Sequence, residues 1–153
     1  MIVIISENIV DFILDSLHTA KRTLDILPAL PPGIKPVYIS VLHAIYRIQR
    51  QDGCARVTDI NKALGFLLPN TTKIVHEMAA LNVVEKVLSP TDKRVVLIRP
   101  TQLGEEYIRE YILRYHALLE REFSALDQES CRIMNETISK VNSAIQKVYQ
   151  NNK

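Results

Sequence analysis

Residues 57–101 read VTDINKALGFLLPNTTKIVHEMAALNVVEKVLSPTDKRVVLIRPT. Apolar residues recur at three- and four-residue steps over 57–64 and again over 69–81, which predicts two short helices. Gly65 is placed to end the first helix in a left-handed conformation. Pro69 suits the first turn of the second helix, where a missing backbone N–H costs nothing.

Two runs rich in Val, Leu and Ile follow the second helix, at 83–88 and 94–98, and they flank the polar loop 89–93. This pattern predicts a β-hairpin whose loop is too long for a tight turn. Asn82 stands between helix and hairpin, where Asn tolerates a left-handed backbone. A helix-turn-helix followed directly by a hairpin is a winged-helix architecture, and the commonest use of that architecture is to hold duplex DNA.

Two further helices are predicted before this stretch. Ser6 can cap the first, and its apolar stripe runs at helical spacing to Leu27. The prolines of 28–33 end it and form a stiff connector. Pro36 begins the second helix, and the sequence RQDG at 50–53 ends it.

Two more helices are predicted after the hairpin. Thr101 can cap the first and Asp127 the second, because their side-chain oxygens can accept from backbone N–H groups of the first turn. The second carries apolar residues at near-heptad spacing from Met134 to Val148. Together with the stripe on the N-terminal helix, this pattern predicts a dimer.

Composition sets limits on the partners of the chain. Its 153 residues are 47% hydrophobic, and a mean hydropathy of +0.02 favours apolar surface reserved for a partner subunit. A net charge of +2 excludes a histone-like polycation, so any DNA contact requires a local basic cluster. The apolar run 1–5 is far shorter than the ~20 residues that span a bilayer. We therefore expect a cytoplasmic protein without a membrane segment.

The second helix of the pair carries five candidate DNA-contacting residues: Asn70, Thr71, Thr72, Lys73 and His76. A helix in the major groove reads base edges with side chains near its N-terminus. Asn can pair with adenine, Thr can contact a thymine methyl group or a phosphate, and Lys can reach guanine or phosphate. The alternative interpretation is the solvated face of an ordinary core helix.

The hairpin loop carries Asp92, Lys93 and Arg94. A narrow minor groove concentrates negative potential and attracts Arg, so this loop is a candidate second DNA contact. Asp92 can pair with Arg94 or with a neighbouring residue and so fix the shape of the loop. The alternative is a charged, solvated turn, but its position directly after a helix-turn-helix favours the DNA interpretation.

The segment DKRVVLIRPTQLG, residues 92–104, resembles the wing of the MarR family of transcriptional regulators. In that family an Asp-x-Arg wing precedes apolar β-residues and a Thr-x-x-Gly that opens the next helix. The helix-turn-helix at 59–87 also matches in spacing. The resemblance implies a mainly α fold with a small β-hairpin wing (α+β), and Arg94 as the wing arginine. Lys93 stands where a second Arg is frequent, and Pro69 where a small polar residue often contacts phosphate.

The resemblance also implies the organisation of the whole chain, 1–153. Residues 35–100 would form the winged DNA-binding domain, and 6–28 and 101–150 the dimerisation helices of an obligate homodimer. The implied operator is a pseudo-palindrome whose half-sites lie about one helical turn, ~10 bp, apart.

Regulators of this family often release DNA when an effector changes the geometry of the dimer. A small-molecule pocket could be lined by five residues with apolar bodies and polar tips: Tyr38, His43, Tyr46, Tyr111 and Tyr115. The alternative for each is packing within the dimer interface. Cys54 and Cys131 have no CxxC spacing and are interpreted as reduced structural thiols rather than redox sensors. His18, His43 and His116 fall on three different predicted helices and lack the spacing of a zinc motif, so no metal is predicted.

The predicted function is a homodimeric repressor that binds double-stranded DNA and is released by an effector. The alternative is a winged-helix module that binds protein and has lost DNA binding. An enzyme is not predicted, because the sequence has no nucleophile elbow, P-loop, dinucleotide fingerprint or metallohydrolase motif. No cofactor is predicted.

Overall fold

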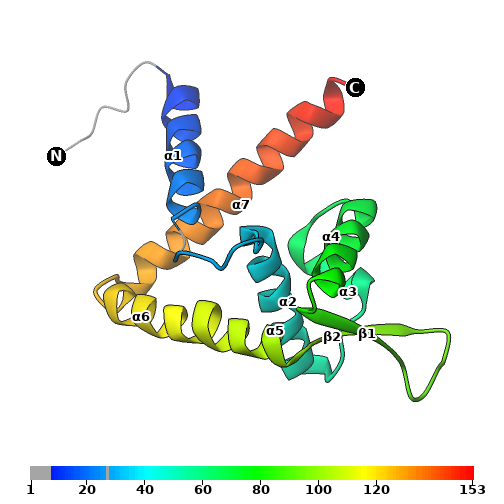
Figure 1. Cartoon of the computed structure of the whole chain (residues 1–153). Helices are drawn as coiled ribbons and strands as arrows, with labels where there is room; N and C mark the ends of the chain where they lie inside the picture. Colours follow the sequence, from blue (N-terminus) through cyan, green and yellow to red (C-terminus); the bar gives the residue numbers. More distant parts are fainter. Residues whose placement is uncertain (1–7, 27) are drawn as a thin grey trace. The chain divides into compact units, whose positions relative to one another are not determined.

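The computed structural model describes residues 8–26 and 28–153. The chain is mainly helical with one two-stranded antiparallel hairpin after the fourth helix, which confirms the predicted fold class (Figure 1). Its elements are α1 (Ile9–Leu24), α2 (Pro36–Asp52), α3 (Val57–Leu64), α4 (Leu68–Ala80), β1 (Val84–Leu88), β2 (Val96–Pro100), α5 (Gln102–Tyr107), the π-helix η1 (Ile108–Leu113), α6 (Arg114–Phe123) and α7 (Gln128–Asn151). They form two compact units that meet in the chain between Tyr111 and Ile112.

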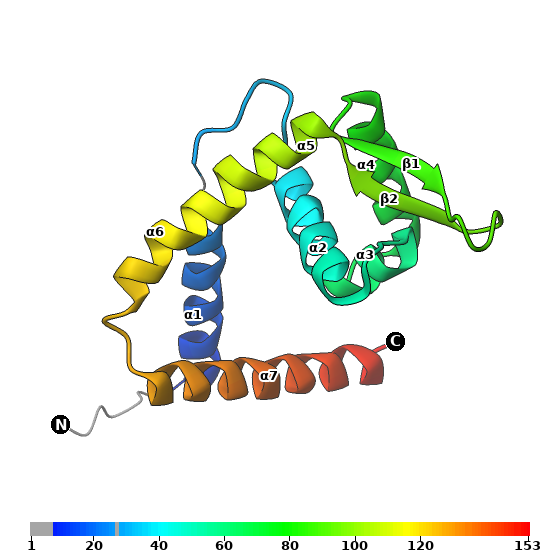
Figure 2. The ribbon, with the colours of Figure 1, turned by 90° about the horizontal axis from the view of Figure 1, so that it is seen from below.

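The core of the first unit lies among α2, α3, α4 and the hairpin (Figure 2). Helix α2 contributes most to it, because its apolar residues form a broad face. The fully buried side chains of this unit include Val41, Leu42, Ile45, Ile60, Val75, Met78, Val83 and Ile98. Burying one such side chain is worth about 1.5–3 kcal/mol of transfer free energy. This core therefore holds the helix-turn-helix and the hairpin together.

Local capping chemistry sets the helix ends in the winged region. Gly53 and Gly65 end α2 and α3 with φ of 77° and 67°, in the left-handed region that Gly adopts without steric cost. Asn82 follows α4 with φ of 57°, as predicted. Pro36 occupies the first turn of α2. Residues that favour turns in the sequence thus set where α3 and α4, the two helices of the helix-turn-helix, end.

The N-terminal helix begins and ends differently from the prediction. The side chain of Asn8 caps α1 by accepting from the backbone N–H of Val10 at 3.2 Å, the role expected for Ser6. Helix α1 then ends at Leu24. Ser6 and Leu27 lie outside the described residues.

The hairpin starts its second strand later than predicted. Val84 pairs with Pro100 and Leu88 with Val96, so Arg94 belongs to the loop and not to the strand. The backbone N–H of Arg94 donates to Asp92 Oδ1 at 3.0 Å, which withdraws this residue from the ladder. A short bridge from Ala55 to Ile98 joins the segment before α3 to the hairpin.

The single helix predicted after Thr101 is three segments in the structure, because the π-helix η1 interrupts it between α5 and α6. Thr101 caps α5 as predicted, since its Oγ1 accepts from the backbone N–H of Gly104 at 3.1 Å. Asp127 caps α7 and accepts from the backbone N–H of Ser130 at 2.8 Å. Within the described residues, no helix is long and apolar enough to cross a membrane.

Candidate DNA-binding surface

The inner face of α4 differs from the predicted one. In the sequence, the apolar residues Ile74, Met78 and Leu81 fall on one face of this helix. In the structure, Thr71, Val75 and Met78 are the residues with no solvent exposure. Leu81 lies just beyond the helix and is 41% exposed. Apolar periodicity misses this face because the polar residue Thr71 occupies the inward position one turn before Val75.

Thr71 is therefore not a DNA-contacting residue, which corrects the prediction. Its Oγ1 donates to Oδ1 of Asn61 on α3 at 2.7 Å. The hydroxyl and the amide satisfy each other inside the helix-turn-helix, as buried polar groups generally do. This bond links the two helices near the N-terminus of α4.

Replacing Thr71 with Val should therefore lower the free energy of unfolding by about 0.5–1.5 kcal/mol, because half-buried Asn61 loses its donor. Thr72→Val is the matched control, since Thr72 is exposed and bonds only to Leu68 O of its own helix. Urea unfolding measures both. Equal losses in the two variants would mean that the Asn61 bond has no special weight.

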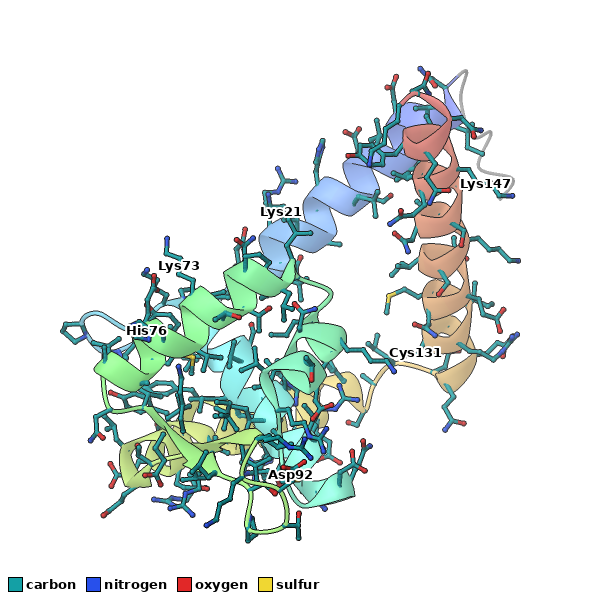
Figure 3. The ribbon with its side chains drawn as sticks, turned by 90° about the vertical axis from the view of Figure 1, so that its right-hand side faces the viewer. Lys21, Lys73, His76, Asp92, Cys131 and Lys147 are labelled. Carbon is teal, nitrogen blue, oxygen red and sulfur yellow. The ribbon has the colours of Figure 1, made fainter. Side chains whose placement is uncertain are left out.

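The outward face of α4 presents the other four candidates: Asn70, Thr72, Lys73 and His76 are all exposed. Lys73 and His76 lie along α4, and Asp92 lies in the hairpin loop (Figure 3). A shallow hollow of about 580 Å³ is lined by Leu68, Pro69, Thr72, Lys73, His76 and Lys86. It contains two lysines and a histidine and no carboxylate, so it suits a polyanion.

Lys86 was not predicted as a member of this surface. It lies on β1 as an exposed residue between half-buried Glu85 and Val87. Its cross-strand partner Ile98 is buried, and so is Val84 on the same face of the hairpin. Strand alternation alone therefore gives no signal that would have found Lys86. The cation of the neighbouring β2, Arg99, instead donates to Glu85 Oε1 at 2.6 Å.

A second polar connection ties α4 to α2. The Glu77 carboxylate oxygen Oε2 accepts from the Tyr38 hydroxyl at 2.7 Å and from Lys35 Nζ at 3.1 Å. These two contacts hold the pKa of Glu77 below its usual value, and the hydrogen bond from the Tyr38 hydroxyl is the larger cause, followed by that from the Lys35 ammonium. Tyr38 is only 2% exposed, so the structure gives it a place in the core rather than in an open effector pocket.

The lowered pKa of Glu77 predicts a pH dependence. Because the folded pKa lies below the unfolded value of 4.5, the stabilisation is present above that value and is lost as the pH falls through the folded pKa. The wild type should therefore lose more stability than Glu77→Gln on acidification from pH 7 to pH 3. Urea midpoints across this range measure the difference, and parallel curves for the two proteins would contradict it.

The remaining candidate pocket residues come from both compact units: His43, Tyr46, Tyr111 and Tyr115. Tyr46 and Tyr111 contact different neighbours. The Tyr46 hydroxyl accepts from Arg50 Nη1 at 3.1 Å, and the Tyr111 ring meets that of Tyr107 edge to face at 5.7 Å. His43 lines a hollow between α2 and α3 with Ser40 and Arg47.

The hairpin loop has a defined shape. Asp92 Oδ1 accepts from the backbone N–H of Arg94 at 3.0 Å and from its Nε at 3.3 Å, which confirms the predicted pairing. The backbone N–H groups of Ser89 and Val95 close the loop onto Val95 O and Asp92 O, both at 2.9 Å. The Arg94 side chain nevertheless stays 92% exposed, and Lys93 is exposed beside it. The loop projects beyond the helices of its unit (Figures 1 and 2).

The two thiols of the chain are separate from this surface. Cys54 is half-buried and Cys131 is exposed on α7, and both are free thiols. Among residues 8–26 and 28–153, no group of three metal-ligating side chains comes together.

The helix-turn-helix, the hairpin and the exposed cations define a winged helix-turn-helix protein. Residues 33–95 match the model of the MarR family. Three similar solved structures share the fold at 16% sequence identity. The PcaV transcriptional regulator of Streptomyces coelicolor, in complex with its natural ligand, has a TM-score of 0.63 over 90% of this chain and 94% of its own. The S. aureus MepR–DNA complex has a TM-score of 0.63 over 91% of this chain and 99% of its own. Bordetella bronchiseptica BpsR has a TM-score of 0.61 over 88% of this chain and 99% of its own.

The winged region, residues 33–95, is that of the MarR family of DNA-binding transcriptional regulators. This assignment confirms the resemblance seen in the wing motif. The family consists of regulators rather than enzymes. Comparison with curated protein sequences gives no match.

Proposed function

We propose that the protein is a repressor that binds a pseudo-palindromic operator as a homodimer and releases it when a small molecule binds. The observation that carries the proposal is the exposed cluster of Lys73, His76 and Lys86 on α4 and β1, in a hollow without a carboxylate. Such a protein acts in the cytoplasm, where it meets DNA. Selection of binding sites from random duplex DNA tests the proposal, because a sequence-specific regulator enriches one motif.

The recognition geometry follows from the exposed faces. Helix α4 is 13 residues long, and it would enter the major groove with Asn70, Thr72 and Lys73 near its N-terminus, where base edges are read. Arg94 would enter the minor groove from the loop. The MepR structure is a DNA complex, which supports DNA as the partner of this chain as well.

A homodimer would cover the apolar surface of the terminal helices. None of the 24 residues of α7 is buried within one chain. Its exposed large hydrophobic residues are Ile133, Met134, Ile138, Ile145, Val148 and Tyr149. Helix α1 likewise has no buried residue and exposes Ile9, Val10 and Phe12. Apolar surface of this extent typically marks a protein–protein interface.

Replacing Ile138 with Asp should convert the dimer into a monomer, because a carboxylate would be desolvated in the apolar interface. Operator affinity should fall with it, since the two half-sites are then bound independently. Light scattering at micromolar concentration gives the mass. Ser139→Asp is the control with the same change of charge on an adjacent exposed residue of α7. A wild-type protein that is already monomeric would contradict the dimer.

Two of the similar structures support a small-molecule effector. PcaV was solved with its natural ligand, and the BpsR structure concerns regulation of DNA binding by 6-hydroxynicotinic acid. The proposal is tested by screening organic acids for release of the selected duplex, with fluorescence anisotropy of the duplex as the readout. A compound that stabilises the protein against heat and also releases DNA would identify the effector.

A further inference from the structure

We propose that Lys35 and Tyr38 are positioning residues that hold the Glu77 carboxylate on α2, so that the ammonium of Lys73 stays available for a DNA phosphate. This inference rests on the proposed DNA-binding function. It assigns a role to the contacts that Glu77 makes with Tyr38 and Lys35, which lie 39 and 42 positions earlier in the sequence.

The default partner of Glu77 on its own helix is Lys73. Residues four apart on a helix are neighbours, with Cβ atoms ~5–6 Å apart, and opposite charges at this spacing attract. In the structure, however, Glu77 Oε2 accepts from Tyr38 and Lys35. Within the described part of the chain, Lys73 forms no ion pair or hydrogen bond.

The two donors differ in how they are held, because the Lys35 side chain is 61% exposed whereas Tyr38 is anchored in the core. The ring of Tyr38 is buried in the core, so its hydroxyl is a fixed donor at the edge of that core. Lys35 is the N-cap residue of α2, directly before Pro36, and its ammonium lies 5.5 Å from the centre of the Tyr38 ring. The pKa of Glu77 is lowered mainly by these two residues, with Lys73 the smallest of the causes. The carboxylate is therefore satisfied without Lys73.

The consequence for DNA binding is electrostatic. For each further phosphate that a protein neutralises, the negative slope of log K against log salt becomes steeper by ~0.9. Lys73 lines both the hollow that contains Glu77 and the hollow that contains His76 and Lys86. If Glu77 were released from α2, it could pair with Lys73 and remove one cation from the DNA-facing surface.

The test uses the double variant Lys35→Ala/Tyr38→Phe and the duplex selected with the wild-type protein. The slope of log K against log salt should become less steep by ~0.9, which corresponds to a roughly fivefold loss of affinity at about 0.15 M salt. Adding Glu77→Gln should restore both quantities, because the amide cannot neutralise Lys73. In a Lys73→Ala background the double change should have no further effect on the slope.

Two results would overturn the inference. An unchanged slope in the double variant would mean that Glu77 does not reach Lys73. A loss that Glu77→Gln fails to restore would mean that Lys35 contacts phosphate directly or that α4 has moved. Unfolding curves identify a folding defect, and in that event the single exposed change Lys35→Ala, with and without Glu77→Gln, supplies the same comparison.

A second measurement needs no DNA. Carbon-13 NMR follows the titration of the Glu77 carboxyl group in the wild type and in the double variant, each with and without the further change Lys73→Ala. Lys73→Ala should leave the Glu77 titration nearly unchanged in the wild type and raise its pKa in the double variant; the reverse pattern overturns the inference. A wild type that binds no selected duplex would overturn the proposed function and the phosphate role of Lys73, whereas this titration still decides which cation holds Glu77.

Discussion

A Gly104→Ala variant is expected to lose about 3 kcal/mol of stability or more, at the upper end of the cost of overpacking. A Cβ atom at this position would lie 2.1 Å from the backbone oxygen of Val83 and 3.0 Å from Cβ of Pro100. The Val83 oxygen cannot move away easily, because it accepts from the backbone N–H and the hydroxyl of Thr101, both at 3.1 Å. The first turn of α5 and the start of β1 must therefore separate.

The measurement is urea unfolding of Gly104→Ala beside Gln102→Ala. Gln102 is an exposed residue of the same helical turn, so its replacement should leave the midpoint close to that of the wild type. The Gly of the Thr-x-x-Gly motif would thus be required by a close backbone approach. Indistinguishable midpoints for Gly104→Ala and Gln102→Ala would show that α5 does not pack on Val83 in this way.

An Arg94→Ala variant should bind the selected operator more weakly by about 1–3 kcal/mol, or roughly 5- to 150-fold. The side chain is 92% exposed and its Nε is oriented by Asp92 at 3.3 Å, so the guanidinium is presented by a shaped loop. Stability should change little, because exposed ion pairs contribute little to folding. Fluorescence anisotropy with the operator, at two salt concentrations, measures the loss.

Arg99→Ala is the matched control for Arg94. It removes the same side chain from the same hairpin, but Arg99 is engaged with Glu85 across the strands at 2.6 Å. Its replacement should therefore cost less affinity than that of Arg94. Arg94→Lys should recover part of the binding, since it keeps the charge but loses the planar fork. Equal affinities of Arg94→Ala and wild type would remove the hairpin loop from the recognition mechanism.

The parts of the fold that the sequence predicts well are those fixed by local chemistry. Gly65, Asn82, Thr101 and Asp127 end or cap helices as expected, because left-handed backbone and side-chain capping involve residues only a few positions apart. The pairing of Asp92 with Arg94 is local in the same sense. The wing motif and the helix spacing together were sufficient for the family.

The parts that the sequence does not predict depend on contacts made only after folding. Thr71 is buried because Asn61, ten residues earlier, satisfies its hydroxyl, and Glu77 is held by donors on another helix. Lys86 joins the basic surface only when β1 is placed beside α4. The π-helix in 108–113 retains the apolar stripe of an ordinary helix, so periodicity alone does not reveal it.

The measurement that tests the central proposal most directly is selection of binding sites from random duplex DNA with the purified protein at physiological salt. A dimeric winged-helix regulator should enrich a pseudo-palindrome whose half-sites lie about one helical turn, ~10 bp, apart. Binding to it should weaken in Arg94→Ala and in the Ile138→Asp monomer. Absence of an enriched motif, with only weak and salt-sensitive binding to every duplex, would contradict the proposal and favour a winged-helix module that binds protein.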